Sequence, residues 1–137
     1  MSLPLSTPPY RHKADHRLPR WNVVGLKSKW LVSIQDEEAI FRVGYNAQWT
    51  ANGEVWSLQS AGNGSLNVIG QDHRKKYIPN GKKYIELVVA KFVVNQGCWH
   101  GYPVNVITDA PPTEIFQMWR VLPGMKKSKI TKLNRPR

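Results

Sequence analysis

Cysteine, acidic side chains and long apolar runs are all scarce in this sequence. Cys98 is the single cysteine of 137 residues, so no disulfide can form within the chain. No run of about 18 consecutive apolar residues occurs, because the richest segment, residues 84–94, contains Glu86 and Lys91. Prolines interrupt the first 21 residues, where a signal peptide needs an unbroken apolar stretch. We therefore expect a cytoplasmic protein with no membrane span.

Basic side chains, in contrast, are abundant and unevenly distributed. The chain has 20 lysines and arginines against 9 aspartates and glutamates, a formal net charge of +11. The excess lies in residues 1–29, in the internal segment 72–91 and in residues 120–137, whereas the apolar segments between them are slightly acidic. A folded body with basic extensions is typical of proteins that bind a polyanion. Basic ends that only improve solubility are the alternative.

Length and composition predict one domain with two basic extensions. A chain of this size buries roughly two thirds of its unfolded surface around one core. Residues 1–20 are rich in proline and poor in aliphatic side chains, which predicts an extended or mobile arm. Residues 21–125 contain the periodic apolar segments and form the predicted domain, and residues 126–137 form a basic tail.

Short runs of β-branched and aromatic residues are typical of strands, and they dominate the predicted domain. Three such runs predict strands at residues 21–26, 29–35 and 39–45. Asn52 and Gly53 lie between two apolar runs and predict a tight hairpin turn. Residues 84–94 are rich in β-branched side chains on both faces, which favours a buried strand over a helix.

Helical periodicity is clearest near the C-terminus. Apolar side chains recur there at helical spacing, at Ile115, Met118, Trp119 and Leu122. Prolines precede the run and a Pro-Gly pair follows it, as at the two ends of a helix. The sequence therefore predicts an α+β domain, with a mainly antiparallel, curved sheet of about five to six strands and one late α-helix packed on it.

Basic and aromatic residues occur together in the segment 72–83 and around Trp99. Lysine and arginine neutralise phosphates, and aromatic rings stack on unpaired bases. These two chemistries and the basic tail predict a nucleic-acid-binding surface. Its predicted residues are Arg74, Lys75, Lys76, Lys82, Lys83, Trp99, His100, Tyr102, Lys126, Lys127, Lys129 and Lys132.

Cys98 and His100 are one residue apart, so on an extended strand their side chains point to the same side. With His12 and His16 they would supply four zinc ligands, but that combination of spacings is unusual for a structural zinc site. As a nucleophile, Cys98 would need His100 as a base and an orienting carboxylate, of which Asp109 is the nearest. We favour a structural cysteine, and we predict no metal site and no cofactor.

A metal-independent ribonuclease needs one group to remove the 2′-hydroxyl proton, another to protonate the leaving oxygen, and cations to stabilise the transition state. The candidate residues for these roles are His73, His100, Lys76 and Tyr102. The two histidines can meet only if residues 84–94 pair with the strand that returns beside them, or form a shorter helix.

Three functions remain open, and we favour a non-enzymatic one. The first is a nucleic-acid-binding module with weak sequence specificity, whose partner is RNA or single-stranded DNA. The second is a protein-interaction or regulatory module that binds an acidic protein. The third is an endoribonuclease of toxin type.

Overall fold

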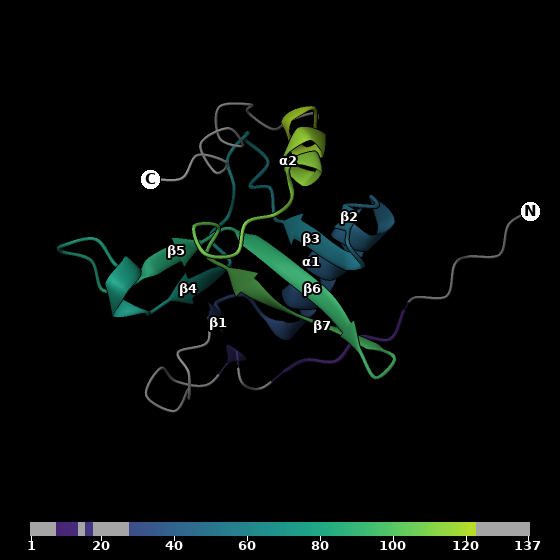
Figure 1. The fold of residues 1–137 in the computed structure, drawn as a ribbon, viewed down its shortest axis with the longest axis horizontal. Helices are drawn as coiled ribbons and strands as arrows, with labels where there is room; N and C mark the ends of the chain where they lie inside the picture. Colours follow the sequence, from purple (N-terminus) through teal and green to yellow (C-terminus); the bar gives the residue numbers. More distant parts are fainter. Residues whose placement is uncertain (1–7, 14–15, 18–27, 123–137) are drawn as a thin grey trace, which may run out of the picture.

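The structure, a computed structural model, describes residues 8–13, 16–17 and 28–122 (Figure 1). Within these ranges the chain forms seven strands and two α-helices, arranged as two antiparallel sheets. The predicted α+β class is confirmed. The predicted single curved sheet with one helix is wrong, because a second sheet and a second helix are present.

The larger sheet has four strands in the order β2-β3-β6-β7. These strands are β2 (Thr50–Ala51), β3 (Glu54–Leu58), β6 (Val89–Asn95) and β7 (Cys98–Val104). Asn52 and Gly53 have φ angles of 55° and 77° between β2 and β3, which confirms the predicted hairpin turn. Gln96 and Gly97, with φ angles of 53° and 78°, form the corresponding turn between β6 and β7.

The smaller sheet has three strands in the order β1-β4-β5. These are β1 (Lys29–Trp30), β4 (Gly70–Asp72) and β5 (Ile85–Leu87). The strand predicted at residues 84–94 is thus extended as expected, but it is divided between β5 and β6 of different sheets. The sheets meet where Gly70 lies against β7, since a Cβ at this position would be 2.4 Å from Cγ of Pro103.

Helix α1 (Ile34–Asn46) occupies most of the region in which the sequence predicted strands at 29–35 and 39–45, so those two predictions are wrong beyond β1. Ser33 begins the helix, because its Oγ accepts a hydrogen bond of 3.1 Å from the amide of Asp36. Its buried face consists of Glu37, Ile40, Phe41 and Gly44, a spacing that fits a helix. The strand predicted at residues 21–26 lies outside the described residues.

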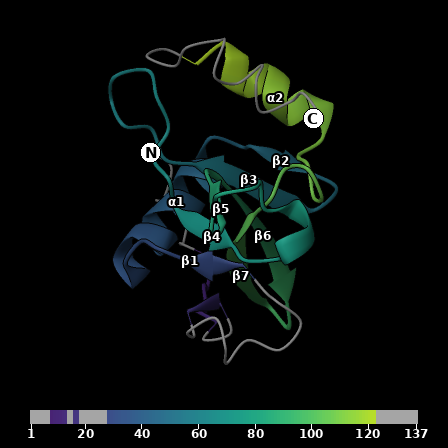
Figure 2. The same cartoon turned by 90° about the vertical axis from the view of Figure 1, so that its left-hand side faces the viewer.

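Helix α2 (Thr113–Arg120) confirms the predicted late helix. Its buried residues, Ile115, Phe116 and Trp119, belong to a hydrophobic cluster with Trp49 and Trp56. A second cluster joins Phe41 of α1 to Phe92 of β6 and to Trp30. The two helices therefore pack on opposite faces of the four-stranded sheet (Figure 2).

Residues 9–11 of the N-terminal segment run along β7, where Tyr10 forms a parallel bridge with Trp99. The amide of Trp99 donates to the carbonyl of Pro9 at 2.9 Å, and the amide of Arg11 donates to the carbonyl of Trp99 at 2.8 Å. The ring of Tyr10 lies 4.9 Å from that of Phe41, centroid to centroid. No helix in the described ranges is both long and apolar enough to cross a membrane.

Candidate functional site

The loop between β4 and β5 projects from the body of the molecule at the end opposite the β6–β7 hairpin (Figure 1). It contains a single 3-10 turn at Lys75–Tyr77 and a tight turn in which the amide of Lys82 donates to the carbonyl of Pro79 at 3.1 Å. Gly81 has a φ of 83°, which suits glycine in that turn. The basic segment singled out in the sequence is therefore an ordered, protruding loop.

A groove of about 790 Å³ runs along this loop, and we call it the loop groove. The rings of Tyr77 and Tyr84 and the side chains of three lysines line it, with Ile107 contributed from the segment that follows β7. The three lysines are Lys76, Lys82 and Lys83, and all are exposed. Aromatic and basic side chains thus share one concave surface.

The three lysines of the loop groove form no ion pair with any carboxylate of the described residues. The ammonium of Lys76 lies 4.9 Å from the centroid of the Tyr77 ring. Glu86 is the only carboxylate among the described residues that line the groove. The groove therefore presents an excess of positive charge beside its tyrosine rings.

The loop is fixed at its start by a buried carboxylate. Asp72 is only 2 % exposed, and its Oδ2 accepts a hydrogen bond of 2.6 Å from Nη2 of Arg74 and one of 3.3 Å from Nδ2 of Asn105. Burial raises the pKa of Asp72, but hydrogen bonds and the charge of Arg74 outweigh it and hold the pKa below the usual 3.8. Arg74 also donates to Oγ1 of Thr108 at 2.9 Å, which ties the loop to the segment after β7.

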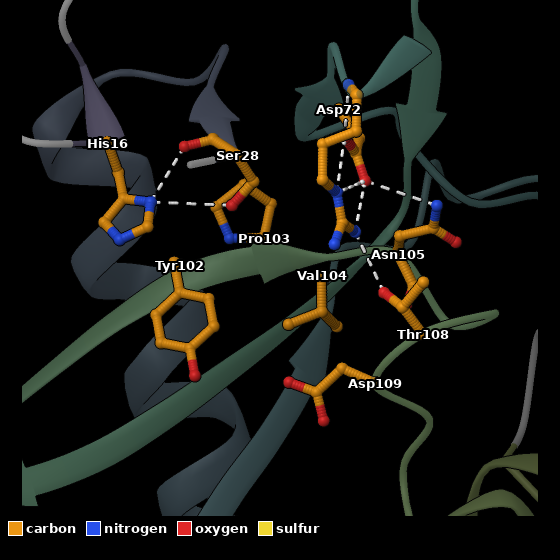
Figure 3. A pocket seen from close by; sticks show the side chains of 10 residues that line it. His16, Ser28, Asp72, Tyr102, Pro103, Val104, Asn105, Thr108 and Asp109 are labelled. Atoms are coloured by element: carbon orange, nitrogen blue, oxygen red, sulfur yellow. Dashed lines mark hydrogen bonds and ion pairs between the residues drawn. The ribbon is translucent and has the colours of Figure 1, made fainter. Parts of the chain in front are cut away.

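A second cavity, of about 370 Å³, lies at the base of the loop, and we call it the β7 pocket (Figure 3). Tyr102, Pro103 and Val104 of β7 give it an apolar wall. Its polar lining includes Asp72, Arg74, Asn105, Thr108 and Asp109. The pocket therefore combines an apolar surface with a few fixed polar groups, as is typical of small-ligand sites.

Lys91 of β6 lies beside this pocket between two carboxylates. Its Nζ is 3.3 Å from Oε2 of Glu54 and 3.4 Å from Oδ2 of Asp109. Burial lowers the pKa of Lys91, but Tyr102 and the two carboxylates outweigh it and raise the pKa above its usual value. Burial also raises the pKa of the Tyr102 hydroxyl, whose ring stacks on His16 at a centroid distance of 5.0 Å.

The predicted nucleic-acid-binding residues are only partly brought together. Lys76, Lys82 and Lys83 share the loop groove, with Lys75 in the adjoining 3-10 turn, and Arg74 and Tyr102 line the β7 pocket. Trp99 and His100 lie at the far end of β7, where Trp99 packs 5.5 Å from Phe41. Four further predicted residues, Lys126, Lys127, Lys129 and Lys132, lie outside the described residues.

The candidate ribonuclease histidines lie in different parts of the fold. His73 follows β4, with its Nε2 2.9 Å from Oε1 of Gln71. The contact of Asp72 with Asn105 places this start of the loop at the C-terminal end of β7. His100 pairs with Val93 and lies five residues before Asn105, a separation of roughly 17 Å along an extended strand. The required pairing of β6 with β7 is therefore present, but it does not bring the two histidines together.

The four candidate zinc ligands are also separated. His12 lies beside Glu37, and Nδ1 of His16 lies 2.8 Å from the carbonyl of Ser28. Cys98 pairs with Asn95 at the β6–β7 hairpin and is half-buried. Within residues 8–13, 16–17 and 28–122, no group of three or more histidine, cysteine, aspartate or glutamate side chains could hold a metal ion.

A buried charge cluster at the start of α1 was not expected from the sequence. Glu37 is fully buried, and its carboxylate accepts hydrogen bonds from the Tyr10 hydroxyl at 2.5 Å and from Nη2 of Arg17 at 2.6 Å. Burial, and then the contact with Glu37, raise the pKa of Tyr10 well above its usual value. Because both donors come from the N-terminal segment, this cluster attaches that segment to the body.

Comparison with known proteins identifies no relative of this chain. No protein family matches the chain, and neither curated proteins nor solved structures match it. Function is therefore inferred from the chemistry of the two cavities.

Proposed function

We propose that the protein binds single-stranded nucleic acid, either RNA or DNA, through the loop groove. The observation that carries this proposal is the combination of three exposed lysines, free of carboxylate partners among the described residues, with two tyrosine rings in one groove. Lysines neutralise the phosphates, and the rings of Tyr77 and Tyr84 stack on the bases. Both contacts tolerate any sequence, so specificity in this groove is weak.

A single strand suits this groove better than a duplex does. Stacking on a tyrosine ring requires a base that is not already stacked between neighbours, as in single strands and loops. The volume of the groove, about 790 Å³, is within the range of roughly 300 to 1,000 Å³ that ligand sites occupy. A single strand can therefore place both its backbone and its bases against the loop.

An acidic protein partner would use the lysines but would gain nothing from the tyrosine rings. The Tyr77→Ala variant distinguishes the two functions. Its binding affinity is measured for a fluorescent single-stranded 12-mer and for labelled polyglutamate of the same charge. We expect Tyr77→Ala to weaken binding of the 12-mer about fivefold or more, because one base loses its stacking partner. Binding of polyglutamate should not change.

The matched control is Tyr77→Phe, which keeps the ring and removes only the hydroxyl. We expect it to bind the 12-mer as the unchanged protein does. Equal losses in the alanine and phenylalanine variants would show that stacking is not involved. Tighter binding of polyglutamate than of the 12-mer, unaffected by either change, would support the acidic-protein function instead.

A further inference from the structure

The β7 pocket adjoins the loop groove through two direct connections. Arg74, which lines the pocket, has its guanidinium carbon 4.8 Å from the centroid of the Tyr77 ring, which lines the groove. Thr108 lines the pocket, and the preceding residue, Ile107, lines the groove. A strand that lies in the groove therefore has the pocket beside it.

Arg74 and Lys91, the cations at the pocket, are both paired with carboxylates, unlike the lysines of the groove. Arg74 is paired with Asp72 at 2.6 Å, and Lys91 is paired with Asp109 and with Glu54. A phosphate in this pocket would meet the carboxylates of Asp72 and Asp109 without an unmatched cation to offset them. A neutral, polar and partly apolar ligand fits the pocket better.

Two polar residues of the pocket, Asn105 and Thr108, already use their side-chain groups on protein partners. Asn105 donates to Asp72 and accepts from the amide of Ile107 at 3.0 Å. Thr108 accepts from Arg74 and donates to the carbonyl of Asn105 at 3.2 Å.

Two further groups of the pocket, on Asp109 and Arg74, can take a ligand, and they have opposite character. Each oxygen of Asp109 has one contact, of 3.4 Å, with Lys91, so further acceptor positions remain on the carboxylate. Nη1 of Arg74 makes no hydrogen bond with the described residues and remains a donor.

We propose that the β7 pocket binds one unpaired nucleobase that carries an exocyclic amino group, held by Asp109. Carboxylates accept hydrogen bonds from such groups, as from N4 of cytosine. Val104 and Pro103 pack on the body of the base, which has a polar edge and an apolar face. Uracil is disfavoured, because it presents a carbonyl oxygen where cytosine presents the amino group. The inference rests on the proposed function, to which it adds a preference among bases.

The test compares oligocytidine with oligouridine of equal length, whose bases differ in the group on C4 and in the proton on N3. We expect the unchanged protein to bind oligocytidine about fivefold or more tightly than oligouridine. Asp109→Asn should bring the two affinities within about twofold of each other, since an amide both donates and accepts. The matched control is Asp36→Asn on α1, an exposed carboxylate outside both cavities, which should keep the preference.

An equal affinity for the two oligonucleotides in the unchanged protein would overturn the proposal, and so would a preference that survives Asp109→Asn. Lys82→Ala should weaken both complexes equally and leave the preference unchanged, because it acts on phosphates.

Free nucleosides separate failure of the pocket from failure of the groove, since they carry no phosphate. Millimolar cytidine should shift the methyl resonances of Val104 and Thr108 more strongly than uridine does. The absence of any shift would contradict the pocket proposal even if oligonucleotides bind. Shifts with cytidine and no binding of oligonucleotides would contradict the proposed function alone.

Discussion

Two partly buried cations of the folded body, Arg17 and Lys91, differ in their partners from the lysines of the loop groove. On the body, Arg17 is paired with the buried Glu37, and Lys91 lies between Glu54 and Asp109. In the groove, Lys82 and its lysine neighbours face solvent and have no carboxylate partner among the described residues. The paired cations stabilise the fold, whereas the cations of the groove remain available to a polyanion.

Replacing the buried carboxylate should have the largest effect. Glu37→Gln removes the charge that pairs with Arg17, and we expect a loss of about 3 kcal/mol in the free energy of unfolding, measured by urea denaturation. Glu38→Gln is the matched control on the same turn of α1. Glu38 forms a half-exposed pair with Arg42, so its loss should cost about 0.5 kcal/mol or less. Similar losses in both variants would show that the buried cluster does not anchor the N-terminal segment.

The base of the loop should show a smaller, pH-dependent effect. Asp72→Asn removes the charge bonded to Arg74, and we expect a loss of about 2 kcal/mol at neutral pH. The folded state lowers the pKa of Asp72 below 3.8, so its carboxylate stabilises the fold above that pH and loses this effect as the pH falls through the lowered pKa. The stability difference between the two proteins should therefore shrink below about pH 4. A difference that stays constant on acidification would contradict this role.

Lysines of the groove should affect stability least. Lys82→Ala combined with Lys83→Ala should change the free energy of unfolding by about 0.5 kcal/mol or less, because both side chains are exposed and without ion pairs among the described residues. Thermal unfolding of the double variant checks this. A loss of several degrees in melting temperature would place these lysines among the structural cations.

Local signals were sufficient to predict several elements. Asn52 and Gly53 form the hairpin turn because the positive φ angles it needs are a property of these two residue types. Helix α2 follows from its apolar spacing and the prolines before it. Neither element depends on which distant segment packs against it.

Helix α1 was missed because its buried face includes an acidic residue. Glu37 interrupts the apolar spacing, and Phe41 with its β-branched neighbours resembles a strand. The signal that could have identified the helix is Ser33 followed three residues later by Asp36, a common start of a helix. Glu37 is paired with Arg17, which lies 20 positions earlier in the sequence. Local sequence patterns do not reveal a contact over that separation.

The candidate site was predictable in its chemistry but not in its assembly. The sequence identified the lysines of the loop and Tyr102, but it grouped them with Trp99, which packs against α1 instead. The length of β7 decides this, because Trp99 lies near the N-terminal end of the strand and the loop lies at its C-terminal end. Tyr77 and Tyr84, the rings that share the groove with the lysines, were not singled out.

The most direct test of the proposed function removes two positive charges from the groove or from the body. Lys82→Ala with Lys83→Ala changes the loop, and Arg11→Ala with Arg120→Ala removes the same charge from exposed positions elsewhere. Binding to a single-stranded 12-mer is measured over a range of salt concentrations. We predict that the loop variant lowers the magnitude of the slope of log K against log salt by up to about 1.4, near 0.7 for each phosphate contact, and that the body variant changes it by less than half as much. Equal changes in the two variants, or an unchanged slope in the loop variant, would contradict binding through the loop groove.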